Sequence, residues 1–124
     1  MENENKKITY FTDLNAWKES HKLVLMIYKI NFPREELLGL ANQLRRAAVS
    51  ITSNIAEGFS RQSYKEKVQF YSMAQGSMTE VQNQLMIARD VQYIAKQEFQ
   101  SLFDQSVIAH KLLNGLIKAS KGRI

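Results

Sequence analysis

Polar side chains follow one face of a predicted helix near the middle of the chain. They recur at intervals of four, four and three residues, and they are Arg46, Ser50, Asn54 and Glu57. This spacing places side chains on one side of a helix. Alanine and isoleucine surround them, as in a helix that is buried. A buried polar group without a partner costs about 1–3 kcal/mol, so we expect these side chains to have partners.

A second polar line follows one face of the next predicted helix, where Ser77, Glu80 and Gln84 are spaced by three and four residues. The two lines could satisfy each other, either within one chain or across a boundary between subunits. Small residues beside them would allow close approach of the backbones, and these are Ala47, Ala48, Ala56, Gly76 and Ser77. Two interpretations remain: a network that fixes helix register or subunit contacts, and a site for a ligand or partner. Both use Arg46, Ser50, Asn54, Glu57, Ser77 and Glu80.

Glu57 is the unusual member of this set. It lies close to the predicted end of its helix, where the helix dipole disfavours a carboxylate by up to about 1 kcal/mol. Arg46 is three turns away along the same helix and therefore too far to pair with it. We expect the partner to be Arg61 or a residue of another subunit.

Residue types that catalyse reactions are present, but their spacing does not match a known site. A di-metal site in a helix bundle uses Glu-x-x-His pairs, whereas His21 follows Lys18 at that distance and His110 follows Val107. The sequence has no His-Glu-x-x-His motif, phosphate-binding loop or Gly-x-Ser-x-Gly elbow. Ser50 has no histidine near it on its helix. We therefore predict no catalytic residue, no metal, no cofactor and no enzymatic activity.

Basic residues gather on the first and last predicted helices, and the formal net charge is +5. One interpretation is ordinary surface solvation, with cations stabilising the end of the last helix. The other is an RNA- or DNA-binding surface that contacts phosphates, since no base-reading motif is present. The candidate residues are Lys18, Lys22, Lys29, Lys111, Lys118, Lys121 and Arg123.

Length and composition favour one soluble domain. The chain has 124 residues, of which 44% are hydrophobic, and it contains no cysteine. No apolar run approaches the roughly 18 residues that a membrane helix needs, and the start MENENKKI lacks a signal-peptide core. We expect a mobile tail over residues 1–10, a single domain over residues 11–124, no contact with a membrane, and a cytoplasmic location.

Helical periodicity predicts the first two elements. The first helix should follow Asp13 as its N-cap and run to about Asn31, where Pro33 follows shortly. Its predicted buried side consists of Leu14, Trp17, His21, Val24, Leu25 and Tyr28, which leaves Leu23, Ile27 and Ile30 on another face. The second helix should begin near Pro33 and stop at Gly58. Its heptad seam is Leu37, Ala41, Leu44, Ala48, Ile51 and Ile55.

Two further helices complete the prediction. Ser63 and Glu66 match a capping box that opens a helix of about 27 residues ending near Asp90. Its buried seam is Tyr71, Ala74, Met78, Val81, Leu85 and Ala88. The last helix spans about 96–121, with Gly122 after it. Four long helices with short connections favour an all-α, antiparallel, up-down-up-down four-helix bundle.

The sequence resembles the four-helix-bundle family whose founders are encoded in intervening sequences of large-subunit ribosomal RNA genes. The matching residues are Asp13-Leu14, Trp17, Gln43 to Ala48, Ser50-Ile51, Asn54 to Gly58, Ala74 to Ser77, and Glu80. The resemblance implies a homopentameric ring, and a similar pentamer is the accessory variability protein of diversity-generating retroelements, which contacts nucleic acid and a reverse transcriptase. Most members have no established activity. Residues 91–95 depart from the family pattern because they lack the usual glycine and the serine-like cap.

Two functions remain compatible with these residues. The first is an oligomeric, non-catalytic bundle that binds nucleic acid through backbone charge. The alternative is a structural ring or adaptor that binds a protein partner and has no nucleic-acid role. A second observation favours self-association in both: the first helix carries apolar residues on more than one face, whereas one bundle buries only one stripe per helix.

Overall fold

Four α-helices make up the fold in the computed structural model, which describes residues 7–124. Two short 3₁₀ helices precede α1 and α2, and no strand occurs within the described range. The protein is therefore all-α, as the sequence predicted. The elements are η1 (Phe11–Asp13), α1 (Asn15–Tyr28), η2 (Arg34–Glu36), α2 (Leu40–Ser60), α3 (Tyr64–Asp90) and α4 (Lys96–Lys121).

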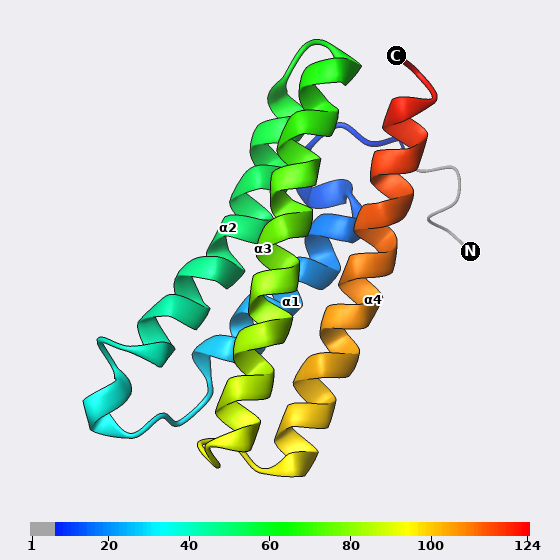
Figure 1. The fold of residues 1–124 in the computed structure, drawn as a ribbon. Helices are drawn as coiled ribbons and strands as arrows, with labels where there is room; N and C mark the ends of the chain where they lie inside the picture. Colours follow the sequence, from blue (N-terminus) through cyan, green and yellow to red (C-terminus); the bar gives the residue numbers. More distant parts are fainter. Residues whose placement is uncertain (1–6) are drawn as a thin grey trace.

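The helices form a closed four-helix bundle. Each α-helix packs against the next one along the chain, and α4 completes the ring by packing against α1. Figure 1 shows that successive helices run in opposite directions, which is the expected up-down-up-down arrangement. Short connections enforce it, because three residues between α2 and α3 leave room only for an antiparallel neighbour.

Heptad seams on α2 and α3 supply the centre of the core. The α2 residues that are fully buried include Ala41, Leu44, Ala48, Ile51 and Ile55, and the α3 residues are Tyr71, Ala74, Met78, Val81, Leu85 and Ala88. Burial of such side chains provides most of the free energy that stabilises a bundle. The predicted seams are therefore confirmed except for Leu37, which is exposed and precedes α2.

The buried face of α1 differs from the prediction. Leu23, Ile27 and Ile30 lie in the core, whereas Leu25 and Tyr28 are each 49% exposed. The physical reason is that α1 is apolar on several sides, so its own pattern leaves its rotation open. The packing of α2 and α4 against α1 decides which side of α1 is buried. The sequence of α1 alone does not contain this information.

Asp13 caps a different helix from the predicted one. Its Oδ2 accepts hydrogen bonds from the backbone N–H groups of Thr9 (3.0 Å) and Tyr10 (3.1 Å), which stabilises η1. Leu14 is the N-cap of α1, and the helix ends at Tyr28 rather than near Asn31. The mobile tail expected over residues 1–10 stays a prediction, and its residues 1–6 lie outside the described residues.

The second α-helix begins later than predicted. Pro33 precedes the 3₁₀ helix η2, and the backbone torsions of Gly39 (φ −104°, ψ −115°) separate this turn from α2. Glu36 joins the two parts because its Oε1 accepts a hydrogen bond from the Leu40 N–H at 3.0 Å. A proline suits the first turn of either helix type, so the sequence signal was ambiguous.

Gly58 was expected to stop α2, but the helix continues through it to Ser60. A Cβ atom at Gly58 would lie 2.7 Å from Cε1 of Tyr71 and 3.1 Å from Cβ of Phe70. The glycine therefore permits close packing of α2 against α3. The Tyr71 ring is enclosed at this point, and burial raises the pKa of Tyr71 to about 12.

The last two helices have the predicted boundaries. Ser63 Oγ accepts a hydrogen bond from the Glu66 N–H at 3.1 Å, which is half of the expected capping box. In the turn that lacks a glycine, Gln92 adopts a positive φ of 67°, a conformation that costs about 1 kcal/mol for a residue with a side chain. None of the helices in the described part of the chain is long and apolar enough to span a membrane.

Candidate functional site

Part of the predicted polar network joins α2 to α3 within one chain. The hydroxyl groups of Ser50 and Ser77 lie 2.8 Å apart, within hydrogen-bond distance. Asn54 Nδ2 donates to the Ser50 carbonyl oxygen at 2.9 Å and to Ser50 Oγ at 3.1 Å. These three partly buried residues therefore satisfy one another, which is the role that the network interpretation assigns to them.

Arg46 and Glu80 lie apart from these hydrogen bonds. Both are exposed, and with Ser50 they line an open hollow of about 350 Å³ between α2 and α3. Glu80 Oε2 lies 3.5 Å from Gln84 Nε2, its neighbour one turn along α3. The hollow combines a cation, a carboxylate and amides, so it remains compatible with a small polar ligand.

Glu57 does not share hydrogen bonds with the other members. Its Oε2 lies 2.7 Å from Arg61 Nη2, in an ion pair one turn along α2. The two side chains are 50% and 39% exposed, so solvent weakens the pair. Of the two partners expected for Glu57, the structure provides Arg61. Within the chain, the six residues therefore do not form one continuous set of hydrogen bonds.

Metal-ligating and nucleophilic groups remain dispersed. No cluster of three or more His, Asp or Glu side chains that could hold a metal ion occurs in residues 7–124. His21 stacks on Trp17, with ring centroids 4.6 Å apart, and His110 is partly buried on α4. Ser50 hydrogen-bonds Ser77 and Asn54, neither of which is a general base.

The seven candidate cations are all exposed. Lys18 and Lys22 lie on α1, and Lys29 follows directly after it. The others lie on α4 or just after it, so the set gathers along two helices that pack side by side. The two ion pairs seen among the described residues involve Arg61 and Arg89, and neither includes these cations. Arg123 differs from the rest because its Nη1 donates to the Tyr64 hydroxyl at 3.0 Å.

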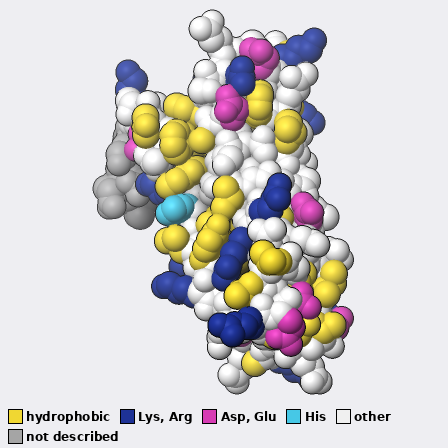
Figure 2. Space-filling model, turned by 90° about the vertical axis from the view of Figure 1, so that its left-hand side faces the viewer, with side chains coloured by type: hydrophobic (Ala, Val, Ile, Leu, Met, Phe, Trp, Pro, Cys, Tyr) yellow, Lys and Arg dark blue, Asp and Glu magenta, His cyan; other side chains and the backbone are white. Residues whose placement is uncertain are grey.

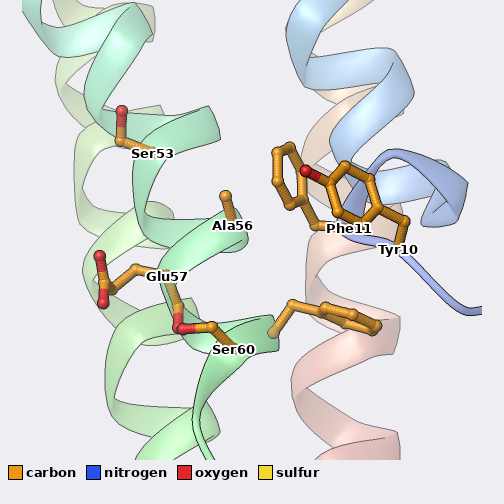
Figure 3. A pocket seen from close by; sticks show the side chains of 7 residues that line it. Tyr10, Phe11, Ser53, Ala56, Glu57 and Ser60 are labelled. Carbon is orange, nitrogen blue, oxygen red and sulfur yellow. The ribbon is translucent and has the colours of Figure 1, made fainter.

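An aromatic cluster at the start of α1 was missed by the sequence analysis. Tyr10 and Phe11 face α2 across an open hollow of about 620 Å³, whose α2 side includes Ser53, Ala56 and Ser60 (Figure 3). The four-residue spacing of Trp17 and His21 was a visible signal. No visible signal in the sequence indicated Tyr10 and Phe11, because their position depends on how η1 turns the chain back towards α2.

The surface on the α2 side mixes hydrophobic and basic groups. Figure 2 shows hydrophobic side chains in a band down this face, with lysine and arginine side chains among them. One such contact is defined by distance: the guanidinium of Arg45 lies 5.2 Å from the centre of the Tyr28 ring. Aspartate and glutamate side chains lie on the same face, so its charge is mixed (Figure 2).

Comparisons with known proteins agree with the fold. A family model described as 23S rRNA-intervening sequence protein matches residues 12–115. A 1.70 Å crystal structure of a protein with unknown function, from the S23 ribosomal protein family of Bacteroides thetaiotaomicron VPI-5482, superposes with a TM-score of 0.74. Its sequence is 22% identical, and the match covers 83% of this chain and 95% of that chain. No curated protein sequence matches significantly.

Proposed function

The chain belongs to the 23S rRNA-intervening sequence protein family, and from this premise we propose that it is an oligomeric, non-catalytic bundle that binds nucleic acid through phosphate contacts. The observation that carries the proposal is the set of exposed cations on α1 and α4. A lysine ammonium that is solvated and outside an ion pair can approach a phosphate without breaking an existing contact. Phosphate contacts of this kind position a protein but read no sequence.

Assembly would multiply a modest charge. One chain carries +5, and a pentamer would carry 5 × 5 = +25. Repetition of the α1 and α4 cations around a ring would place many of them along one polyanion. Each neutralised phosphate releases condensed counterion, so affinity should fall by about 0.7–0.9 logarithmic units per contact for each logarithmic unit of salt.

A titration at several salt concentrations tests the proposal. We expect RNA and DNA of shuffled sequence to bind with similar affinity, and we expect binding to weaken steeply with salt. The double variant Lys111→Glu/Lys118→Glu should reduce both the affinity and the salt slope, because it reverses two exposed cations on α4. The matched control is Arg34→Glu/Lys96→Glu, which changes the net charge equally at exposed positions outside the candidate set.

The control should retain most of the salt slope if binding is local to the candidate cations. An equal loss in both double variants would mean that net charge alone attracts the nucleic acid. Absence of binding to RNA and DNA at low salt would refute the proposal.

A second candidate function is a structural ring or adaptor that binds a protein. The specific observation in its favour is large apolar residues left on the outside, such as Leu38 (92% exposed) and Met73 (56% exposed). Recovery of a protein partner that persists after nuclease treatment would favour this candidate. Loss of the partner with nuclease would favour nucleic-acid binding.

A further inference from the structure

Four aromatic rings form a continuous ladder where the chain enters α1. The rings of Tyr10 and Phe11 stack with centroids 4.8 Å apart, and Phe11 meets Trp17 edge-on at 5.6 Å. Trp17 then stacks on His21 at 4.6 Å with an interplanar angle of 10°. Tyr10 is exposed, the other three side chains are half-buried, and Trp17 packs against the core from outside, so the ladder runs from the surface to the edge of the core.

The outer end of the ladder borders the hollow next to α2. Tyr10 is 60% exposed, and Figure 3 shows Phe11 directed towards Ala56 on the opposite side. Ser53 and Ser60 contribute hydroxyl groups to the lining. The Glu57 carboxylate lines the same hollow but is directed away from Tyr10 and Phe11, and Arg61 neutralises it at 2.7 Å. An open space of about 620 Å³ is large enough for a flat heterocyclic ring.

Two exposed cations lie on α1 next to residues of the ladder. Lys18 and Lys22 follow Trp17 and His21 directly on α1, and both are exposed. The nearby carboxylates keep their charge but accept hydrogen bonds from neutral groups of the chain. Asp13 accepts hydrogen bonds from backbone N–H groups of η1, and the carboxylate of Glu19 accepts one from Gln105 on α4.

We propose that the ladder and hollow bind the unpaired bases of single-stranded nucleic acid by stacking, while Lys18 and Lys22 contact the adjacent phosphates. Aromatic side chains beside a cationic stripe are the usual means of binding single strands without sequence preference. A duplex keeps its bases stacked inside and can offer this surface only its phosphates. The inference rests on the proposed nucleic-acid binding and adds a preference for single strands.

Trp17 belongs to the ladder and is the sole tryptophan of the chain, so its fluorescence reports directly on this surface. The full-length protein is titrated with a 20-nucleotide oligothymidylate, with a duplex of equal length, and with inorganic polyphosphate. We expect the single strand to quench the tryptophan emission and to bind about tenfold more tightly than the duplex. Polyphosphate, which has no bases, should bind without quenching.

Variants of the hollow separate stacking from charge. Tyr10→Ala should weaken single-strand binding about tenfold, within the range found for loss of one stacking ring, and should leave polyphosphate binding unchanged. Ser53→Leu, which fills the hollow at an exposed helical position without an aromatic face, should act in the same direction. Val91→Ala, an exposed apolar truncation just after α3, is the matched control and should have no effect.

Failure of the inference can be told apart from failure of the proposed function. Equal binding of single strand, duplex and polyphosphate, with no quenching and no effect of Tyr10→Ala, would overturn base stacking and leave phosphate binding intact. Absence of binding to all three polyanions would overturn both.

Discussion

Two glycines of the family motif have opposite surroundings, and this decides what an alanine would do at each. Gly58 on α2 is buried, and a Cβ there would meet the Tyr71 ring at 2.7 Å and 2.9 Å. Gly76 lies in the middle of α3, and apart from its chain neighbours and the backbone of its own turns of helix, no described atom lies within 4 Å of the added Cβ. The first glycine is required by packing, whereas the second only weakens its helix.

We predict that Gly58→Ala destabilises the protein by about 1–3 kcal/mol, because the ring or the helix must move to admit a methyl group. Gly76→Ala should stabilise it by about 0.5–1 kcal/mol through higher helix propensity. Chemical denaturation of both variants measures the two values. A Gly58→Ala variant as stable as the parent would show that Tyr71 is free to move, contrary to its enclosed position.

The sequence predicted which helix face carries the polar residues better than it predicted which residues those side chains contact. The four-residue spacing correctly placed Ser50 and Asn54 on one face, where they hydrogen-bond each other, and Ser77 on α3 meets Ser50 between the two helices. Glu57 belongs to the same face by count, and its partner within the chain is Arg61, one of the two candidates expected from the sequence. Periodicity gives the direction of a side chain along its own helix, but the length and rotamer of each side chain decide which neighbour it reaches.

At the scale of elements, Glu36 connects three segments and makes their packing dependent on pH. Its carboxylate accepts hydrogen bonds from the Leu40 N–H at the start of α2 and from the Tyr93 hydroxyl at 2.8 Å, beyond the end of α3. These bonds lower the pKa of Glu36 from its ordinary value of 4.5. The Tyr93 pKa is raised in turn by its hydrogen bond to Glu36.

We predict that Glu36→Gln removes part of the acid sensitivity of the fold. Because the folded-state pKa is lowered, ionised Glu36 stabilises the protein above pH 4.5, and this contribution disappears as the pH falls through the lowered pKa. Thermal melting between pH 3 and pH 7 should therefore show a smaller decline for the variant than for the parent. Glu35→Gln is the control, since Glu35 is exposed and next in sequence. Parallel melting curves for Glu36→Gln and the parent would contradict the prediction.

The start of α3 and the end of α4 were predictable because a strong local signal lies at each. Ser63 caps α3 through its own side chain, and Gly122 follows α4. The start of α2 was not predictable from Pro33, since Gly39 and the hydrogen bond from Leu40 to Glu36 determine where the α-helix begins. The buried face of α1 depends on how α2 and α4 pack against it, and this packing is fixed only in the assembled bundle.

At the scale of the whole molecule, the apolar residues that remain outside the bundle bear on self-association. The sequence argument for assembly used Leu23, Ile27 and Ile30 as a second apolar face, but these residues are buried in the core of the single chain. Leu25 and Tyr28 take their place as exposed apolar residues on α1. The argument for an oligomer therefore rests on different residues of α1. Met73 and Ile87 on α3 are further exposed apolar residues that support it.

We predict a homo-oligomer, with a pentamer preferred because of the family resemblance. Light scattering coupled to size-exclusion chromatography should give five times the mass of one chain at micromolar concentration. Contacts made by apolar side chains do not weaken with salt, so the mass should be the same at moderate and at high salt, whereas phosphate binding falls. Removal of bound nucleic acid by nuclease must precede the measurement, because a polyanion could hold chains together. A monomeric mass after that treatment would contradict the prediction, and the +25 of a pentamer would then no longer be available to strengthen binding.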